Sequence, residues 1–124
     1  MEHTLEVYFD GELIFYSDGK WLHPLFELEN FLMQQKFNPA SLILKDKIVG
    51  RAAALLQLYL GVKSVRAGMM SQLAKELFDH FQIDYEYENL VDRIQCRTEE
   101  LLKDEYDPNK AYEIILGLLN QKNQ

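Results

Sequence analysis

One stretch of the chain predicts its fold class, Leu44-Lys-Asp-Lys-Ile-Val-Gly-Arg-Ala-Ala-Ala-Leu-Leu56. The stretch overlaps the apolar run 41–45, whose length is typical of a buried strand, and it leads into 50–60, which is apolar almost all round. Such a segment predicts a central helix covered on several sides. The polar residues between the two predict a short turn. A buried strand that feeds a buried helix is typical of α/β proteins.

The segments on either side of this stretch extend the same pattern. The aromatic and β-branched runs 5–9 and 12–17 are joined by Asp10-Gly11, a pair that favours a tight hairpin turn. A helix is predicted over 24–35 because Pro24 suits a first turn and leucines recur at helical spacing. Downstream we expect a strand at 63–67, a helix capped by Ser71, a strand at 84–87, a helix over 90–103 and a last helix capped by Asp107. Together these predict a mixed sheet covered on both faces, within one domain spanning residues 1–124.

Composition and charge restrict the possible partners and the cellular location of the protein. Hydrophobic residues make up 48% and charged residues 27% of the sequence, which is ordinary for a globular domain. The net charge of −7 argues against nucleic acid and anionic membranes as partners. Cys96 is the only cysteine, the N-terminus does not resemble a signal peptide, and the apolar run 52–60 is too short to cross a bilayer. We therefore expect a cytoplasmic protein.

The strand-to-helix junction is the best candidate for a ligand site. In open α/β sheets, ligands bind where the carboxyl end of a strand meets the start of the next helix, whose unpaired amides attract anions. Gly50 would allow a ligand to approach the backbone, and Arg51 supplies a planar cationic group for phosphate or carboxylate. Lys47 and Arg66 would raise the local potential. They belong to the segment 41–75, which contains six basic residues and one acidic residue.

The start of the next helix, at Met70 and Ser71, would contribute amides and a hydroxyl to the same ligand. The predicted ligand-binding set is therefore Lys47, Gly50, Arg51, Arg66, Met70 and Ser71. A structural alternative explains the same residues: Gly50 would permit tight packing, Arg51 would pair with a nearby carboxylate, and Ser71 would only cap its helix. The sequence leaves both interpretations open.

Several kinds of chemistry are not indicated. The three histidines (His3, His23 and His80) have no partners at metal-ligand spacing, so we predict no metal site. No motif surrounds Cys96, and the segment around Gly50 lacks the second glycine and Lys-Ser/Thr pair of a phosphate-binding loop. No catalytic residue and no cofactor are predicted, and whether the protein is an enzyme stays open.

The run Lys45-Asp-Lys-Ile-Val-Gly-Arg-Ala-Ala-Ala-Leu-Leu56 also resembles the signature of a bacterial family, the domain of unknown function 1893. The hairpin and the later Tyr-Glu-Asn-Leu-Val91 fit this family too, and the resemblance extends from Leu5 to Arg97. It implies a cytidine deaminase-like fold, which is a three-layer α/β/α sandwich with a mixed sheet. At the segment 94–97, Cys96 stands where the family often has asparagine, and no Cys-Pro element follows.

The resemblance does not imply zinc chemistry. Cytidine deaminases hold zinc with a His/Cys-x-Glu motif at the start of one helix and a Pro-Cys-x-x-Cys motif at the start of the next. The corresponding segments here, 50–52 and 69–72, contain neither a zinc ligand nor the glutamate. We therefore predict a domain that binds a small anionic molecule, nucleotide-like or phosphorylated, without zinc. The alternative is a non-catalytic protein-interaction domain that kept the scaffold, and a homodimer is left open.

Overall fold

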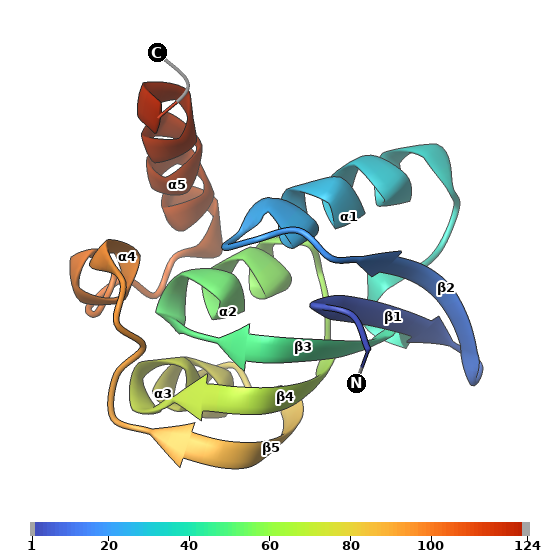
Figure 1. Ribbon diagram of the computed structural model, residues 1–124, viewed down its shortest axis with the longest axis horizontal. Coiled ribbons are helices and arrows are strands. Elements are labelled where there is room, and N and C mark those ends of the chain that lie inside the picture. Colours follow the sequence, from blue (N-terminus) through green and yellow to red (C-terminus); the bar gives the residue numbers. More distant parts are fainter. Residues whose placement is uncertain (1, 123–124) are drawn as a thin grey trace.

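The computed structural model describes residues 2–122, so residue 1 and residues 123–124 of the predicted domain lie outside the described part. A five-stranded sheet has the order β2-β1-β3-β4-β5 (Figure 1). Its strands are β1 (Leu5–Phe9), β2 (Glu12–Ser17), β3 (Ile43–Val49), β4 (Ser64–Ser71) and β5 (Asp84–Val91). The helices are α1 (His23–Gln34), α2 (Arg51–Tyr59), α3 (Gln72–His80), α4 (Arg97–Leu101) and α5 (Pro108–Lys122), with a 3-10 turn at Pro39–Ser41.

Strand direction confirms the predicted mixed sheet. β1 pairs antiparallel with both β2 and β3, whereas β3, β4 and β5 are parallel to one another. The hairpin forms where the sequence predicts it, because Asp10 (φ 50°) and Gly11 (φ 81°) both adopt the left-handed conformation that a two-residue hairpin turn requires. The predicted α/β class is therefore correct, and the arrangement is consistent with a three-layer fold.

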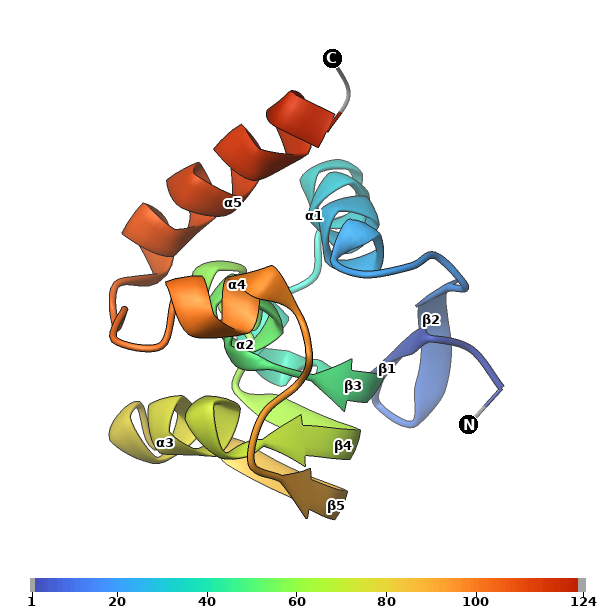
Figure 2. The same cartoon turned by 60° about the vertical axis from the view of Figure 1, so that its left-hand side comes forward.

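The core lies between the sheet and its helices. Alternate strand residues such as Leu44 and Val65 are fully buried and pack with residues of α1, α2 and α3. Helix α5 lies outside α2, against which it buries Ala111 and Ile115 (Figure 2). Strand residues of the opposite parity, such as Lys45, are exposed, so the helices within residues 2–122 do not cover this face, although the sequence predicts a sheet covered on both faces. This alternation follows from the period of two residues along a strand.

The strand before α2 is longer than predicted. The sequence predicts that it ends near Lys45 and that a polar turn precedes Gly50, but β3 continues to Val49. Asp46 lies within the ladder, opposite Leu5 of β1 and Ala67 of β4. Aspartate is common in turns and rare in strands, so the sequence around Asp46 favours a turn. Pairing with strands on both sides overrides this local preference.

The predicted helix over 90–103 is wrong in its first half. Leu90 and Val91 finish β5, where they pair with Met70 and Ser71 of β4, and only Arg97–Leu101 is helical. The predicted strands at 63–67 and 84–87 are also too short, since β4 extends to residue 71 and β5 to residue 91. None of the helices within residues 2–122 is long and apolar enough to cross a membrane.

Candidate functional site

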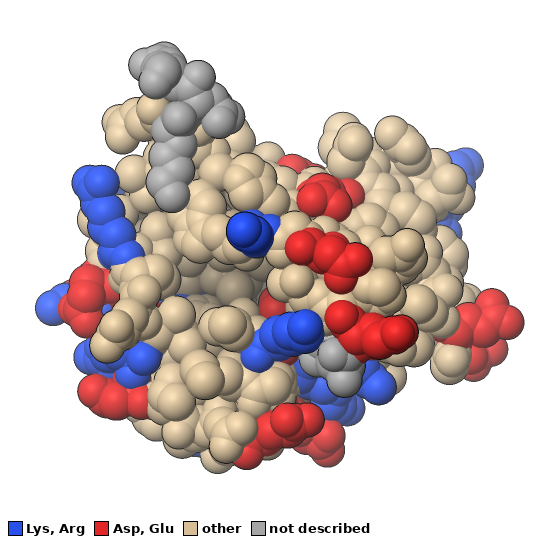
Figure 3. Space-filling model, viewed as in Figure 1, with Lys and Arg blue, Asp and Glu red and all other residues tan. Residues whose placement is uncertain are grey.

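The carboxyl ends of β3 and β4 and the starts of α2 and α3 meet at one edge of the sheet, where α4 also lies (Figures 1 and 2). A cavity of about 370 Å³ opens beside the start of α2. Its apolar wall includes Trp21, Leu22, Pro24, Leu25, Ile48 and Ile94. Its polar groups include Thr4, Lys20, Asp46, Lys47, Cys96 and Thr98. The space-filling view shows a hollow on this face of the molecule (Figure 3). A volume in this range suits a small ligand.

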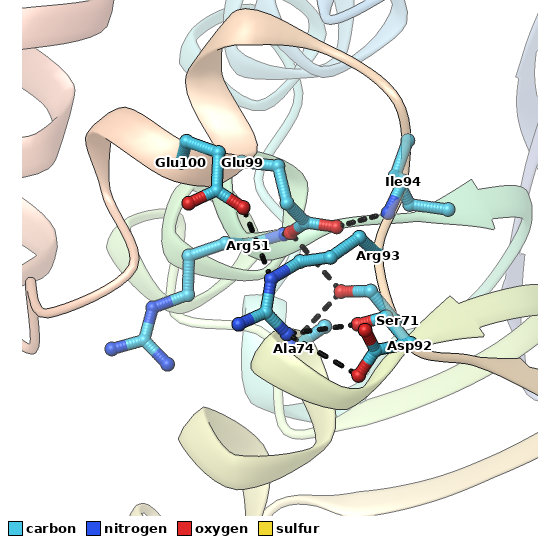
Figure 4. A network of polar contacts seen from close by, with 8 residues as sticks. All are labelled: Arg51, Ser71, Ala74, Asp92, Arg93, Ile94, Glu99 and Glu100. Carbon is cyan, nitrogen blue, oxygen red and sulfur yellow. Dashed lines mark hydrogen bonds and ion pairs between the residues drawn. The ribbon is translucent and has the colours of Figure 1, made fainter.

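Next to the cavity, one buried carboxylate connects the starts of α2 and α3. Glu99 of α4 is 1% exposed, and its Oε1 accepts hydrogen bonds from Arg51 N at 2.7 Å and from Ser71 Oγ at 3.1 Å. Its Oε2 accepts from Ile94 N (Figure 4). Ser71 Oγ in turn accepts from Ala74 N, so it caps α3 as predicted. An external anion is predicted between these helix starts, but the carboxylate of Glu99 occupies that position.

Gly50 lies close to side chains of the segment that leads into α4. A Cβ atom at this position would lie 3.3 Å from Ile94 Cγ1 and 3.4 Å from Glu99 Oε1. The close approach that the sequence analysis expects at Gly50 is therefore present, and the approaching groups belong to the chain itself. Gly50 also lies on the cavity wall, so it contributes to both features.

The guanidinium of Arg51 donates hydrogen bonds to backbone carbonyl groups. The residue is fully buried, and its Nε and Nη1 donate to the carbonyl oxygens of Leu102 (3.1 Å) and Leu73 (2.7 Å). Its Nη2 donates to the carbonyl of Glu105, and the group lies 4.5 Å from the centre of the Tyr106 ring. Figure 4 shows the guanidinium pointing away from Glu99. All three of its guanidinium nitrogens are engaged, so Arg51 connects α3 to the segment after α4, and the residue also lies on the cavity wall.

The other predicted ligand-binding residues separate into two groups. Lys47 is exposed and lines the cavity. Arg66 forms ion pairs with Asp84 at 3.0 Å and Glu86 at 3.2 Å and lies outside the cavity lining. Met70 is fully buried in the core, and Ser71 is occupied by Glu99 and by its own helix. The structure thus brings Lys47, Gly50 and Arg51 to the cavity and leaves Arg66, Met70 and Ser71 off its wall.

Sequence reasoning missed Asp46, the buried acid of the cavity. Asp46 is 7% exposed; its Oδ1 accepts from Ile48 N at 3.3 Å and its Oδ2 accepts from Gln57 Nε2 at 3.0 Å. Burial raises the pKa of Asp46 to about 7, although both hydrogen bonds favour the ionised form and lower it. The sequence held one signal: Asp46 has the same strand parity as the apolar Leu44, which places it on the buried face.

Donors for an anionic group remain beside the cavity. Ala54 N makes the first hydrogen bond of α2, to Gly50 O, so the amides of Ala52 and Ala53 precede the helical ladder. Both alanines line the cavity. The exposed Lys20 and Lys47 also line it and add positive charge. This helix start retains donors that Glu99 does not use.

Two further features of the wall bear on its chemistry. Trp21 has a positive φ of 58°, which is uncommon for a bulky residue and marks local strain at the cavity edge. Cys96 Sγ lies 3.3 Å from Thr98 Oγ1, and both residues face the cavity. Among the described residues, no group of three His, Cys, Asp or Glu side chains is placed to hold a metal ion.

These features define a mixed-sheet α/β domain with a ligand-sized cavity at the start of its central helix. More particularly, the chain belongs to a family described as a domain of unknown function (DUF1893), whose model matches residues 2–119. The family predicted from the sequence is thereby confirmed. The crystal structure of a DUF1893 family protein (TM1506) from Thermotoga maritima is similar, with a TM-score of 0.80 and 25% sequence identity, over 92% of this chain and 79% of that chain. Comparison with curated proteins gives no match.

Proposed function

We propose that this protein binds a small anionic molecule in the cavity beside α2. The observation that supports the proposal most directly is the cavity itself, which combines an apolar wall with a buried carboxyl and unpaired helix amides. Ligand sites in proteins commonly have this composition, with a few polar groups placed in an apolar pocket. We also propose that the fold is cytidine deaminase-like.

The anionic group of the ligand would contact the start of α2. The amides of Ala52 and Ala53 offer hydrogen bonds there, and the helix dipole adds roughly half a positive charge. Lys20 and Lys47 would hold the group electrostatically from the cavity rim. In this form the proposal keeps Lys47 and Gly50 from the predicted set, and it assigns the guanidinium of Arg51 to the support of the fold.

A ligand screen with matched charge variants tests the proposal. Nucleotides, phosphorylated sugars and small carboxylic acids would be added to the purified protein, and the melting temperature measured. A ligand at a hundredfold excess over its dissociation constant stabilises the folded state by about 2.7 kcal/mol. The double variant Lys20→Glu and Lys47→Glu should lose this gain. The double variant Lys63→Glu and Lys103→Glu, which changes exposed residues outside the cavity lining, should keep it.

Two outcomes would contradict the proposal. If no anion in the panel stabilises the wild-type protein, the cavity is not an anion site. If the rim variant and the control variant respond equally to a stabilising anion, the ligand binds elsewhere. Because both double variants change the net charge by the same amount, a general electrostatic effect cannot produce the expected difference between them.

A further inference from the structure

The cavity contains a buried acid without a cationic partner. Asp46 accepts hydrogen bonds from two neutral donors, Ile48 N and Gln57 Nε2, and none of the ion pairs among the described residues includes it. A buried carboxylate is costly unless an opposite charge or several strong donors compensate it. Asp46 faces an open cavity, so a bound molecule can reach it and supply the missing charge.

We propose that the ligand of this cavity is a zwitterion, whose protonated amine pairs with Asp46 while its anionic group contacts the amides of Ala52 and Ala53. This inference rests on the proposed function and names the class of molecule: a short ω-amino acid or an amino phosphate. Such a ligand would place each of its charges against the opposite charge of the cavity wall. A simple anion would leave Asp46 unpaired and would add a like charge nearby.

The charged groups around Asp46 do not take the place of the amine. The strand residues directly opposite it, Leu5 and Ala67, are apolar. Lys45 lies over the ring of Tyr8, at 4.8 Å from its centre. The cations among the cavity residues are the exposed Lys20 and Lys47 and the backbone-bound Arg51, and none of them forms an ion pair with Asp46 in the described structure.

The orientation of Gln57 favours a carboxylate that accepts hydrogen bonds. Its Nε2 donates to Asp46 Oδ2, while its own Oε1 is buried without a hydrogen-bond partner among the described residues. An acid that stayed protonated would offer a hydrogen to that amide oxygen. The amide presents its donor instead. This arrangement fits an Asp46 that is ionised when an amine is bound.

Asp46 lines the same cavity as Ala52 and Ala53, so one bound molecule can contact the acid and the start of α2 together. An α-amino acid carries its amine and its carboxylate on the same carbon atom. An unbranched ω-amino acid holds the two charges further apart and is therefore the probe we choose.

Matched pairs of probes test the inference by calorimetric titration of the full chain. We expect 5-aminopentanoate to bind about tenfold more tightly than pentanoate at pH 7. The variant Asp46→Asn should remove most of this preference, because an amide cannot form the ion pair. The control variant Asp104→Asn, at an exposed position outside the cavity lining, should keep it.

The number of protons exchanged provides a second readout that needs no variant. Since the pKa of Asp46 is raised to about 7, the group is partly protonated at neutral pH. An amine should displace that proton, whereas pentanoate should increase proton uptake. Repeating the titration in buffers with different ionisation enthalpies gives the sign for each probe.

The possible results separate the two proposals. If pentanoate binds and the amine adds neither affinity nor proton release, the zwitterion inference is wrong while the anion site stands. If the preference for the amine persists in Asp46→Asn, the amine contacts another group, and the inference again fails. If neither these probes nor the anion panel binds, the proposed function itself is wrong.

Discussion

At the scale of single residues, Glu99 and Asp46 show two ways of burying a carboxylate. Glu99 accepts hydrogen bonds from two backbone amides and one hydroxyl, so its charge is compensated by donors that would otherwise be unpaired. Asp46 receives two neutral donors and faces a cavity. The first arrangement stabilises the fold, and the second leaves a group available for interaction with a ligand.

Removing the carboxylate of Glu99 should therefore destabilise the protein. Glu99→Ala leaves the buried amide of Arg51 and the hydroxyl of Ser71 without their acceptor, and we expect a loss of about 3 kcal/mol in the free energy of unfolding. The neighbouring Glu100 is the matched control, since it is exposed and its ion pair within residues 2–122 is with Arg93. Glu100→Ala should cost less than about 1 kcal/mol. Urea denaturation measures both, and equal losses would contradict the buried role of Glu99.

Asp46 should make stability depend on pH. Its pKa is about 7 in the folded protein and about 3.9 when unfolded, so the folded state binds more protons between these values. Protonated Asp46 therefore favours the folded state at low pH, and this stabilisation is lost as the pH rises through 7. Between pH 5 and pH 8 the wild-type protein should lose roughly 2 kcal/mol relative to Asp46→Asn. Urea denaturation at both pH values measures this change, and Asp104→Asn, which keeps Asp46, should lose as much stability as the wild type.

At the scale of elements, α4 is stable only because other segments support it. A helix of five residues is too short to persist alone in water. Arg51 donates to the carbonyls of Leu102 and Glu105, directly after α4, and Glu99 anchors the helix to the starts of α2 and α3. The segment 97–105 is thus attached to the rest of the domain through these polar contacts and through Leu102, which is buried in the hydrophobic core.

Changing the guanidinium of Arg51 should loosen this segment before the rest of the fold. Lysine cannot reproduce three directed donations, so Arg51→Lys should reduce stability by about 3 kcal/mol. Amide hydrogen exchange should rise first within 97–105 and least in β3 and β4. Arg97→Lys, at an exposed position of α4, should leave the exchange pattern unchanged. A uniform increase across all elements in Arg51→Lys would show that α4 does not depend on this residue.

Two glycines in different elements should respond to alanine with opposite signs. A Cβ at Gly68 in β4 would lie 2.7 Å from the backbone oxygen of Lys47, so the adjacent strand would have to move. Gly68→Ala should cost about 2 kcal/mol. Gly117 in α5 has open space around its Cβ position, and Gly117→Ala should add up to about 1 kcal/mol by favouring the helix. Thermal unfolding of the two variants measures both effects.

Some elements of this fold are encoded by local sequence signals, and others depend on contacts that are distant in sequence. The hairpin and the start of α5 depend on local signals, namely the Asp10-Gly11 turn and the Asp107 cap, whose Oδ1 accepts from Asn109 N. These were predictable. The ends of β3 and β5 depend on pairing with β4, which is distant in sequence, and there the local pattern was misleading.

The candidate site was predictable in its place and less so in its residues. The junction at Gly50 does border the candidate cavity, as expected of an α/β sheet edge. The partners of Arg51 were not foreseeable, because Glu99 and Leu102 are separated from it by about fifty residues and no local motif connects them. Asp46 lies between Lys45 and Lys47, and three charged residues in a row are typical of a turn. Its buried position in a strand was therefore not predicted.

At the scale of the whole molecule, the cavity is assembled from distant parts of the chain. Thr4 precedes the hairpin, residues 19–22 lead into α1, and α1 itself contributes Pro24 and Leu25. Residues 94–98 precede and begin α4. The wall is complete only when these segments have all packed against β3 and α2. A ligand that binds there should therefore stabilise the fold as a whole and should protect the segment 94–98 together with α1 from hydrogen exchange.

The position of Glu99 has a consequence for competition between bound groups. Its carboxylate is attached to the same chain as the helix starts it bonds, so its effective concentration there is on the order of millimolar or higher. The concentration of a dissolved carboxylate such as acetate has to exceed that value before it competes with Glu99 for the amide of Arg51. Glu99 thus competes with external anions for the amide of Arg51. The amides of Ala52 and Ala53 remain for external molecules.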